Sequence, residues 1–223
     1  MTTSQRASRN RGFTLVEIMI SATIVGVVVS IAVLIVFQAL QTYYYDVGRV
    51  EVNQDMRKLT RDMTTNAVFS NYFLIYPNFA TRSISTGTGS AATTIDYTMP
   101  PGSSGDMVLF ITDSVDSTSG VTQVSNIVGY YRDGTTNTAG PVRTFTVAVA
   151  PGTSNANIYS LLPAVSTQST NGQVIPLALD YGSYSLFYNY FGRSVMIKSE
   201  VLEPGANNRK ATSTYNFTVT PRG

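Results

Sequence analysis

The feature that most constrains this chain is a stretch without a charged side chain, from Ile18 to Tyr45. It is longer than the roughly 20 apolar residues that a helix needs to cross the ~30 Å hydrocarbon layer of a bilayer. The sequence therefore predicts a membrane-spanning helix over residues 13–45. One acidic residue, Glu17, stands at its leading edge and needs a separate explanation.

Basic residues precede the apolar stretch. Arg6, Arg9 and Arg11 lie within residues 1–12, which contain no acidic residue. Basic residues beside a spanning segment favour the cytoplasmic side, so we expect this leader inside the cell and the chain after about Tyr45 outside it. The apolar run is too long for an ordinary secretory signal, and no A-x-A pattern closes it. We therefore expect no cleavage after the run.

The sequence GFTLVE at residues 12–17 suggests a different cut. Together with the basic leader and the long apolar run, it resembles the processing motif of type IV pilins and type II secretion pseudopilins. The resemblance implies that a membrane peptidase cuts after Gly12 and methylates the new N-terminal Phe13. It also makes Glu17 the acid that the family uses in assembly. It extends from residue 1 to about 40.

The position of Glu17 also has a physical interpretation. An acid at the centre of a spanning helix costs roughly 2.5–3.5 kcal/mol on insertion scales, less near an edge, and such residues usually have a partner. Cleavage at Gly12 creates a cationic amine at Phe13, which can pair with Glu17 of a neighbouring subunit and set the axial register. The alternative is local: T-x-x-E at residues 14–17 is a capping box, and an acid suits the positive end of a helix.

The helix surface offers a second candidate for subunit packing. Ala22, Gly26 and Ser30 recur every four residues and form a stripe that lets helix backbones approach closely in lipid. Small residues are also common in any spanning helix, so both interpretations stay open. Major type IV pilins usually carry a proline in this helix, and this helix has none. That absence favours a minor pilin or a pseudopilin.

Composition limits the chemistry of the chain. Its 223 residues suffice for one anchor and one head domain of roughly 150 residues. It contains no Cys and no His, which excludes disulfides, thiolate metal sites and Ser-His-Asp or Cys-His nucleophiles. Removing residues 1–12 takes away three of 15 basic and none of 13 acidic residues, leaving a net charge of −1. We expect no enzyme activity, no cofactor, no metal and no nucleic-acid partner.

The remainder of the chain predicts an α+β fold. Residues 46–70 read as an amphipathic continuation of the helix, with a stripe at Val52, Met56, Leu59, Met63 and Ala67, although a break near Gly48 is an alternative. Residues 71–223 read as a strand-rich head whose antiparallel sheet packs on this stripe. The predicted strands are 72–76, 95–99, 107–112, 127–132, 142–149, 174–179, 184–190, 194–202 and 214–220, and residues 83–94 and 113–120 are predicted loops. This layout loosely resembles J-type pseudopilins and W-type minor pilins.

The head offers two weaker candidates for binding. Asp113 and Asp116 supply oxygen ligands suited to calcium, but they lack the Gly and Glu of an EF-hand loop and also fit a solvated turn. The head is rich in tyrosine, a residue enriched at binding surfaces but also common in half-buried strands. The tyrosines considered for partner contact are Tyr130, Tyr131, Tyr181, Tyr184, Tyr188 and Tyr190.

The preferred function is structural. The resemblance implies a single-pass protein of the bacterial inner membrane that is cut by prepilin peptidase. It then joins other pilin or pseudopilin subunits in an extracellular or periplasmic filament, as a minor subunit by preference. Its partners would be those subunits, the inner-membrane assembly machinery with a separate ATPase, and membrane lipid before assembly. The alternative is a membrane-tethered binding module or adhesin that never polymerises.

Overall fold

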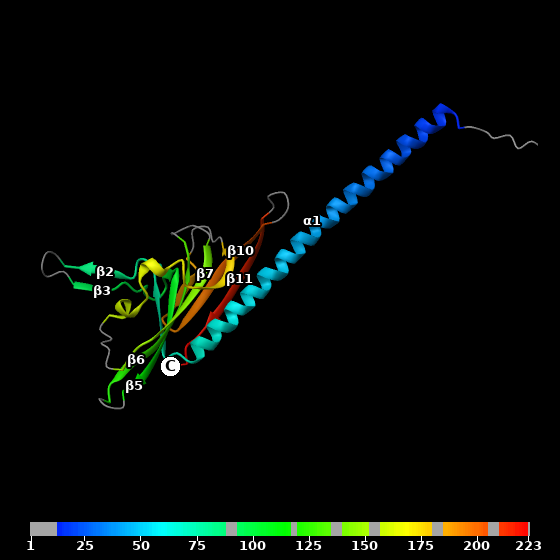
Figure 1. Ribbon diagram of the computed structural model, residues 1–223. Coiled ribbons are helices and arrows are strands. Elements are labelled where there is room, and N and C mark those ends of the chain that lie inside the picture. Colours follow the sequence, from blue (N-terminus) through cyan, green and yellow to red (C-terminus); the bar gives the residue numbers. More distant parts are fainter. Residues whose placement is uncertain are drawn as a thin grey trace, which may run out of the picture. The chain divides into compact units, whose positions relative to one another are not determined.

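The computed structural model describes residues 13–87, 93–116, 120–134, 140–151, 157–179, 185–204 and 210–222 (Figure 1). The chain separates into two compact units, Met1–Asp46 and Val47–Gly223. One helix, α1 (Leu15–Val68), contributes residues to both units over its 54 residues. The predicted continuation of the helix beyond the apolar stretch is therefore confirmed, and the alternative break near Gly48 is wrong.

Strands follow the helix throughout the second unit. They are β1 (Tyr72–Tyr76), β2 (Ser83–Thr86), β3 (Thr93–Asp96), β4 (Ser104–Gly105), β5 (Met107–Val115), β6 (Thr122–Arg132), β7 (Gly140–Ala148), β8 (Gly172–Leu179), β9 (Phe187–Tyr190), β10 (Ser194–Pro204) and β11 (Lys210–Val219). Two short 3₁₀ helices, η2 (Ile158–Leu161) and η3 (Val165–Thr167), lie between β7 and β8. The observed class is the predicted one, α+β with a long N-terminal helix and antiparallel sheets.

The strands form three antiparallel sheets. The largest has the order β1-β5-β6-β7-β8, the second has the order β11-β10-β9-β4, and β2 and β3 form the third. Sequence neighbours pair in most of these ladders, as in a meander, and a bulge between Thr112 and Asp113 interrupts the β5–β6 register. The exceptions are β4, which pairs with β9, and β1, which pairs with β5 and places Tyr72 opposite Ile111. The end of α1 is thereby held beside a strand that begins nearly 40 residues later in the sequence.

The second half of α1 packs on the sheets through the predicted stripe. Met56, Leu59, Met63 and Ala67 are at most 2 % exposed and recur at helical spacing, so they form one buried face. The side chain of Val52, also assigned to the stripe, lies outside the described residues. The stripe shares one hydrophobic cluster with residues of both larger sheets and with Leu186 just before β9. The strand residues include Val108, Phe110, Tyr130, Val142, Phe187, Val195, Ile197 and Val219.

The opposite face of the five-stranded sheet is also buried. Along β5, Val108 and Phe110 face the helix, whereas Met107, Leu109 and Ile111 belong to a second cluster on the other side. This alternation follows from the two-residue period of a strand. The segment with η2 covers the second cluster through Ile158 and Leu162. The central strands are therefore enclosed on both faces.

Several predicted boundaries differ from the structure. Residues 83–94, predicted as a loop, contain β2 and the start of β3, and the strand predicted at 95–99 ends at Asp96. Residues 113–115, also predicted as loop, extend β5 to Val115. Side-chain composition misled these predictions, because Ser and Thr fit turns and exposed strands equally well. The strand predicted at 72–76 is β1 with the same bounds, and the other predicted strands are present with shifted ends.

Candidate functional site

The candidate site begins where α1 starts. The hydroxyl oxygen of Thr14 accepts a hydrogen bond from the backbone N–H of Glu17 at 3.3 Å, and the Thr14 carbonyl accepts one from Ile18 at 3.2 Å. Thr14 is therefore the N-cap, and Glu17 lies in the first turn, where a carboxylate interacts favourably with the helix dipole. The capping role that the sequence suggested is compatible with a second role in assembly, because the cap uses the Glu17 backbone.

The predicted processing residues surround this cap. Phe13 directly precedes it and is 76 % exposed, and the Glu17 side chain is also exposed. Gly12, the predicted cut site, and the rest of the leader lie outside the described residues. Only four residues separate Phe13 from Glu17, so a new terminus at Phe13 would stand one helical turn from the carboxylate of its own chain.

The first part of α1 has the length and composition of a membrane span. The span covers Leu15–Val47, and none of its residues is buried within the chain. Apolar side chains such as Val25, Ile31 and Phe37 are each more than half exposed. A water-soluble domain rarely exposes so large an apolar surface, and this segment is compatible with a membrane anchor.

The serine and threonine hydroxyls of the span form hydrogen bonds within the helix. The hydroxyls of Ser21, Ser30 and Thr42 each donate to the carbonyl oxygen four residues earlier, at 2.8–3.0 Å. Thr23 donates to the Met19 and Ile20 carbonyls. Hydroxyls bonded in this way carry little penalty in lipid. Glu17 differs from them, because a carboxylate is an acceptor and the helix backbone offers it no free donor beyond the first turn.

The small-residue stripe lies on the open surface of the same helix. Ala22, Gly26 and Ser30 are all exposed. A methyl group added to Gly26 would meet no atom of the described chain within 4 Å beyond the local helix backbone. The small size of Gly26 is therefore not required by any contact within the described part of the chain.

The N-terminal segment also matches a known family model. Residues 7–33 fit the prokaryotic N-terminal methylation motif. This motif is typical of type IV pilins and pseudopilins, so the chain has a prepilin-like N-terminus. The match spans the end of the leader, the cap and the small-residue stripe. No curated protein and no solved structure matches the chain, so the head stands without a recognised relative.

The weaker head candidates fare differently. Among the described residues, Asp113 and Asp116 do not belong to a group of three or more acidic side chains placed to hold a metal ion. Tyr130 and Tyr131 are buried, which makes their assignment to a partner surface wrong. Tyr190 is 48 % exposed. Tyr181 and Tyr184 lie outside the described residues.

Two buried tyrosines instead form hydrogen bonds between the central sheet and the segments that cover its two faces. Tyr130 faces α1 and its hydroxyl accepts a hydrogen bond from Asn66 at 2.5 Å. Burial raises the pKa of Tyr130 to about 12, with Asn66 acting in the opposite direction and Asp62 adding to the rise. Tyr131 points to the other face, where its hydroxyl donates to the Gln168 carbonyl. The pair of neighbouring residues therefore anchors both sides of β6.

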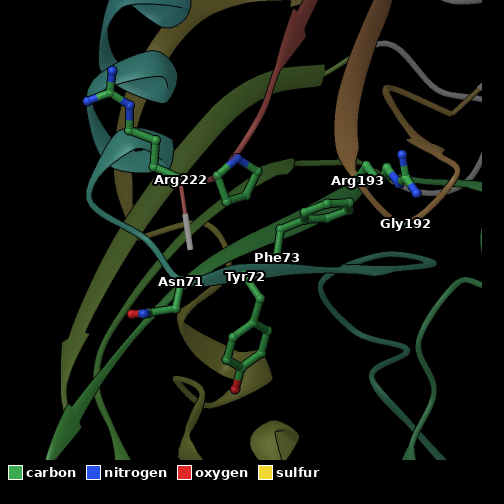
Figure 2. Close-up of a pocket in the computed structure, with 7 residues that line it drawn as sticks. Asn71, Tyr72, Phe73, Gly192, Arg193 and Arg222 are labelled. Atoms are coloured by element: carbon green, nitrogen blue, oxygen red, sulfur yellow. The ribbon is translucent and has the colours of Figure 1, made fainter.

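A pocket opens between the start of β1, the β9–β10 turn and the segment that follows β11 (Figure 2). It measures about 200 Å³, and its lining contains two cationic side chains and no acidic one. In Figure 2, Arg193 and Arg222 lie on opposite sides of the Phe73 ring. The two guanidinium groups therefore do not point toward a common position where they could bind one ligand together.

Sequence reasoning missed Asp96, a polar residue of the head whose side chain accepts three hydrogen bonds. Its carboxylate accepts hydrogen bonds from the Tyr76 hydroxyl at 2.9 Å and from the backbone N–H groups of Ile158 and Tyr159 at 2.8 and 2.7 Å. It thereby caps η2 and joins that helix to β1 and β3. A signal was present in the sequence, because Asp96 is the only charged residue between Arg82 and Asp106.

Proposed function

We propose that this chain is a structural subunit of a type IV pilus or type II secretion pseudopilus. The observation that supports this most is the methylation motif at residues 7–33, set on an apolar helix whose surface is uncovered within the chain. In this proposal residues 1–12 are a leader, 13–45 the membrane and assembly helix, 46–70 its amphipathic continuation and 71–223 the head. The protein acts by assembly and not by catalysis.

The proposed sequence of events starts in the bacterial inner membrane. The leader stays in the cytoplasm and the head lies outside. Prepilin peptidase cuts after Gly12 and methylates Phe13, and the assembly machinery then moves the subunit from lipid into a periplasmic or extracellular filament. Other pilin or pseudopilin subunits cover the apolar helix there, with the stripe at Ala22, Gly26 and Ser30 allowing close approach.

In this proposal Glu17 sets the axial register between neighbouring subunits of the filament. The carboxylate pairs with the cationic Phe13 amine of an adjacent subunit, and the attraction is strong because few water molecules screen it. The structure supports the availability of the group, since the Glu17 side chain is exposed and the cap at Thr14 uses only its backbone N–H. We assign the chain to a minor position because the spanning helix has no proline.

The mass of the mature N-terminus tests the processing step. The protein is extracted from membranes of a cell with the complete machinery, and the expected terminus is Phe13 bearing one added methyl group. A functional protein that still starts at Met1 would overturn the proposal and favour a tethered binding module. Protein that remains only in membranes as a monomer would do the same.

The assembly step is tested separately with Glu17→Gln. This change keeps the shape of the side chain and removes its charge, so we expect normal insertion and normal cleavage but reduced recovery in sheared filaments. Glu17→Asp, which retains the charge, is the matched control and should keep part of the incorporation. Normal incorporation of the Gln variant would remove the pairing with Phe13.

A further inference from the structure

The β2–β3 hairpin forms a sheet of its own, which we call the arm (residues 83–86 and 93–96). In Figure 1 its two strands extend away from the larger sheets of the head. Its register pairs Ile84 with Ile95 and Ser85 with Thr94. A two-stranded hairpin by itself is at best marginally stable in water, so the arm needs support from its base or from another molecule.

The base of the arm is firmly held by the head. Asp96, at the end of β3, makes the three hydrogen bonds to Tyr76, Ile158 and Tyr159 described above. Arg82, just before β2, donates to the Pro163 carbonyl at 2.7 Å and stacks over the Phe79 ring. Asp96 and Arg82 are thus the charged residues at the base of the arm, and both are bonded to the head. The direction in which the arm leaves the head is therefore fixed, while its strands remain outside the core.

The edges of the arm are open and unprotected. Among the described residues no third strand pairs with either β2 or β3, so each strand has a row of backbone groups free to pair outward. Proteins usually guard such edges with Lys, Pro or inward-pointing charges. Residues 83–95 contain no charged residue and no proline. Nothing in the sequence of the arm opposes pairing with another strand.

The side chains of the arm also suit a partner. Ile84 and Ile95 are each 42 % exposed and face each other across the two strands. The pair presents a small apolar surface on the same face as Thr86 and Thr93, whereas Ser85 and Thr94 lie on the other face. Extending the sheet by further strands would cover part of these isoleucines, and burial of apolar area is stabilising.

We propose that the arm of a second copy of this chain pairs edge to edge with this one, forming a four-stranded sheet. Identical surfaces associate only where they do not repel, and the arm meets this condition because it carries no charge between Arg82 and Asp96. Backbone pairing is also self-complementary for antiparallel strands. An acidic or basic partner would find no opposite charge on the arm. The inference does not depend on the filament assignment.

Single introduced cysteines test the pairing, because the chain has no cysteine of its own. The full-length chain carries Ser85→Cys on β2 or Thr94→Cys on β3, both at exposed positions. It is produced in membranes of a host without prepilin peptidase, so that no filament can form, and is treated with a short bifunctional maleimide. Ser114→Cys, an exposed serine at the end of β5, is the matched control.

We expect a crosslinked homodimer with at least one arm variant and none above background with the Ser114 control. The control also reports dimers that form only through the membrane helix. Adding Thr86→Lys to the Ser85→Cys chain, or Thr93→Lys to the Thr94→Cys chain, should abolish the crosslink without lowering the melting temperature, since these threonines are exposed. Equal crosslinking of arm and control variants, an unaffected lysine variant, or a product with a different protein would each overturn the proposal.

Discussion

The carboxylate of Asp106 lies 2.5 Å from the guanidinium of Arg132, with both side chains almost wholly removed from water. The other carboxylate oxygen accepts the backbone N–H of Leu186 at 3.0 Å, and the Asp106 carbonyl accepts the N–H of Arg132. One aspartate thus joins the start of β5, the end of β6 and the approach to β9. The two larger sheets share this buried ion pair in addition to their hydrophobic contacts.

Removing one partner of this ion pair should strongly destabilise the head. Asp106→Asn leaves the Arg132 cation buried without its counter-charge, and we expect a loss of about 3–5 kcal/mol in the free energy of unfolding. Denaturant titration of the full chain in detergent measures the loss. The double variant Asp106→Asn/Arg132→Met removes both charges and should be less destabilised than the sum of the single variants. Strict additivity would contradict a direct pairing.

Asp96 should be more important to stability than Tyr76, although they share one hydrogen bond. Asp96→Ala removes the acceptor of all three bonds and uncaps η2, for an expected loss of about 1.5–3 kcal/mol. Tyr76→Phe removes one donor and leaves both backbone N–H groups paired with Asp96, so its loss should be about 1 kcal/mol. Thermal unfolding of the two variants compares them. Equal losses would show that the capping of η2 contributes nothing.

Larger side chains on the two faces of the spanning helix should have different effects on incorporation into filaments. Gly26→Leu enlarges the small-residue stripe, and we expect it to reduce incorporation into filaments while leaving membrane insertion intact. Val28→Leu is the matched control, because it lies two residues, or about 200°, around the same helix and is also exposed within the chain. Quantitative immunoblots of sheared filaments and membranes measure both. Equal incorporation of the two variants would exclude a packing role for Gly26.

Alkaline pH should weaken the head through its buried phenols. Burial raises the pKa of Tyr130 to about 12, from its ordinary value of 10.0, so the folded chain holds this proton more tightly than the unfolded chain. The stabilisation is complete below about pH 10 and is lost as the pH rises toward about 12. Denaturant titrations across this range should show a steeper decline for the natural chain than for Tyr130→Phe. Identical declines would show that Tyr130 does not contribute to the pH dependence.

The sequence predicts the elements whose residues have one strong preference. The uncharged run identifies the spanning part of α1, because few structures other than a membrane helix tolerate such a run. The stripe at Met56, Leu59, Met63 and Ala67 is buried as its spacing predicts. Strands such as β1 and β5 are found because their apolar residues leave no alternative. The α+β class follows from these elements alone.

The remaining features depend on contacts between distant segments. Residues 83–94 read as a loop although they build most of the arm, because Ser, Thr and Gly do not distinguish a turn from an exposed strand. Tyr130 and Tyr131 are surface candidates by residue type, yet both are buried, because β6 lies in the middle of a sheet covered on both faces. The three bonds of Asp96 join segments about 20 and 60 residues away. No local pattern encodes such distances.

Met56 and Val219 belong to the same hydrophobic cluster, although one lies early in the chain and the other four residues from its end. The core therefore cannot close until β11 has joined the cluster. Contacts so far apart in sequence also form slowly. The apolar face of α1 is thus completed by the strand that is synthesised after all the other strands described here.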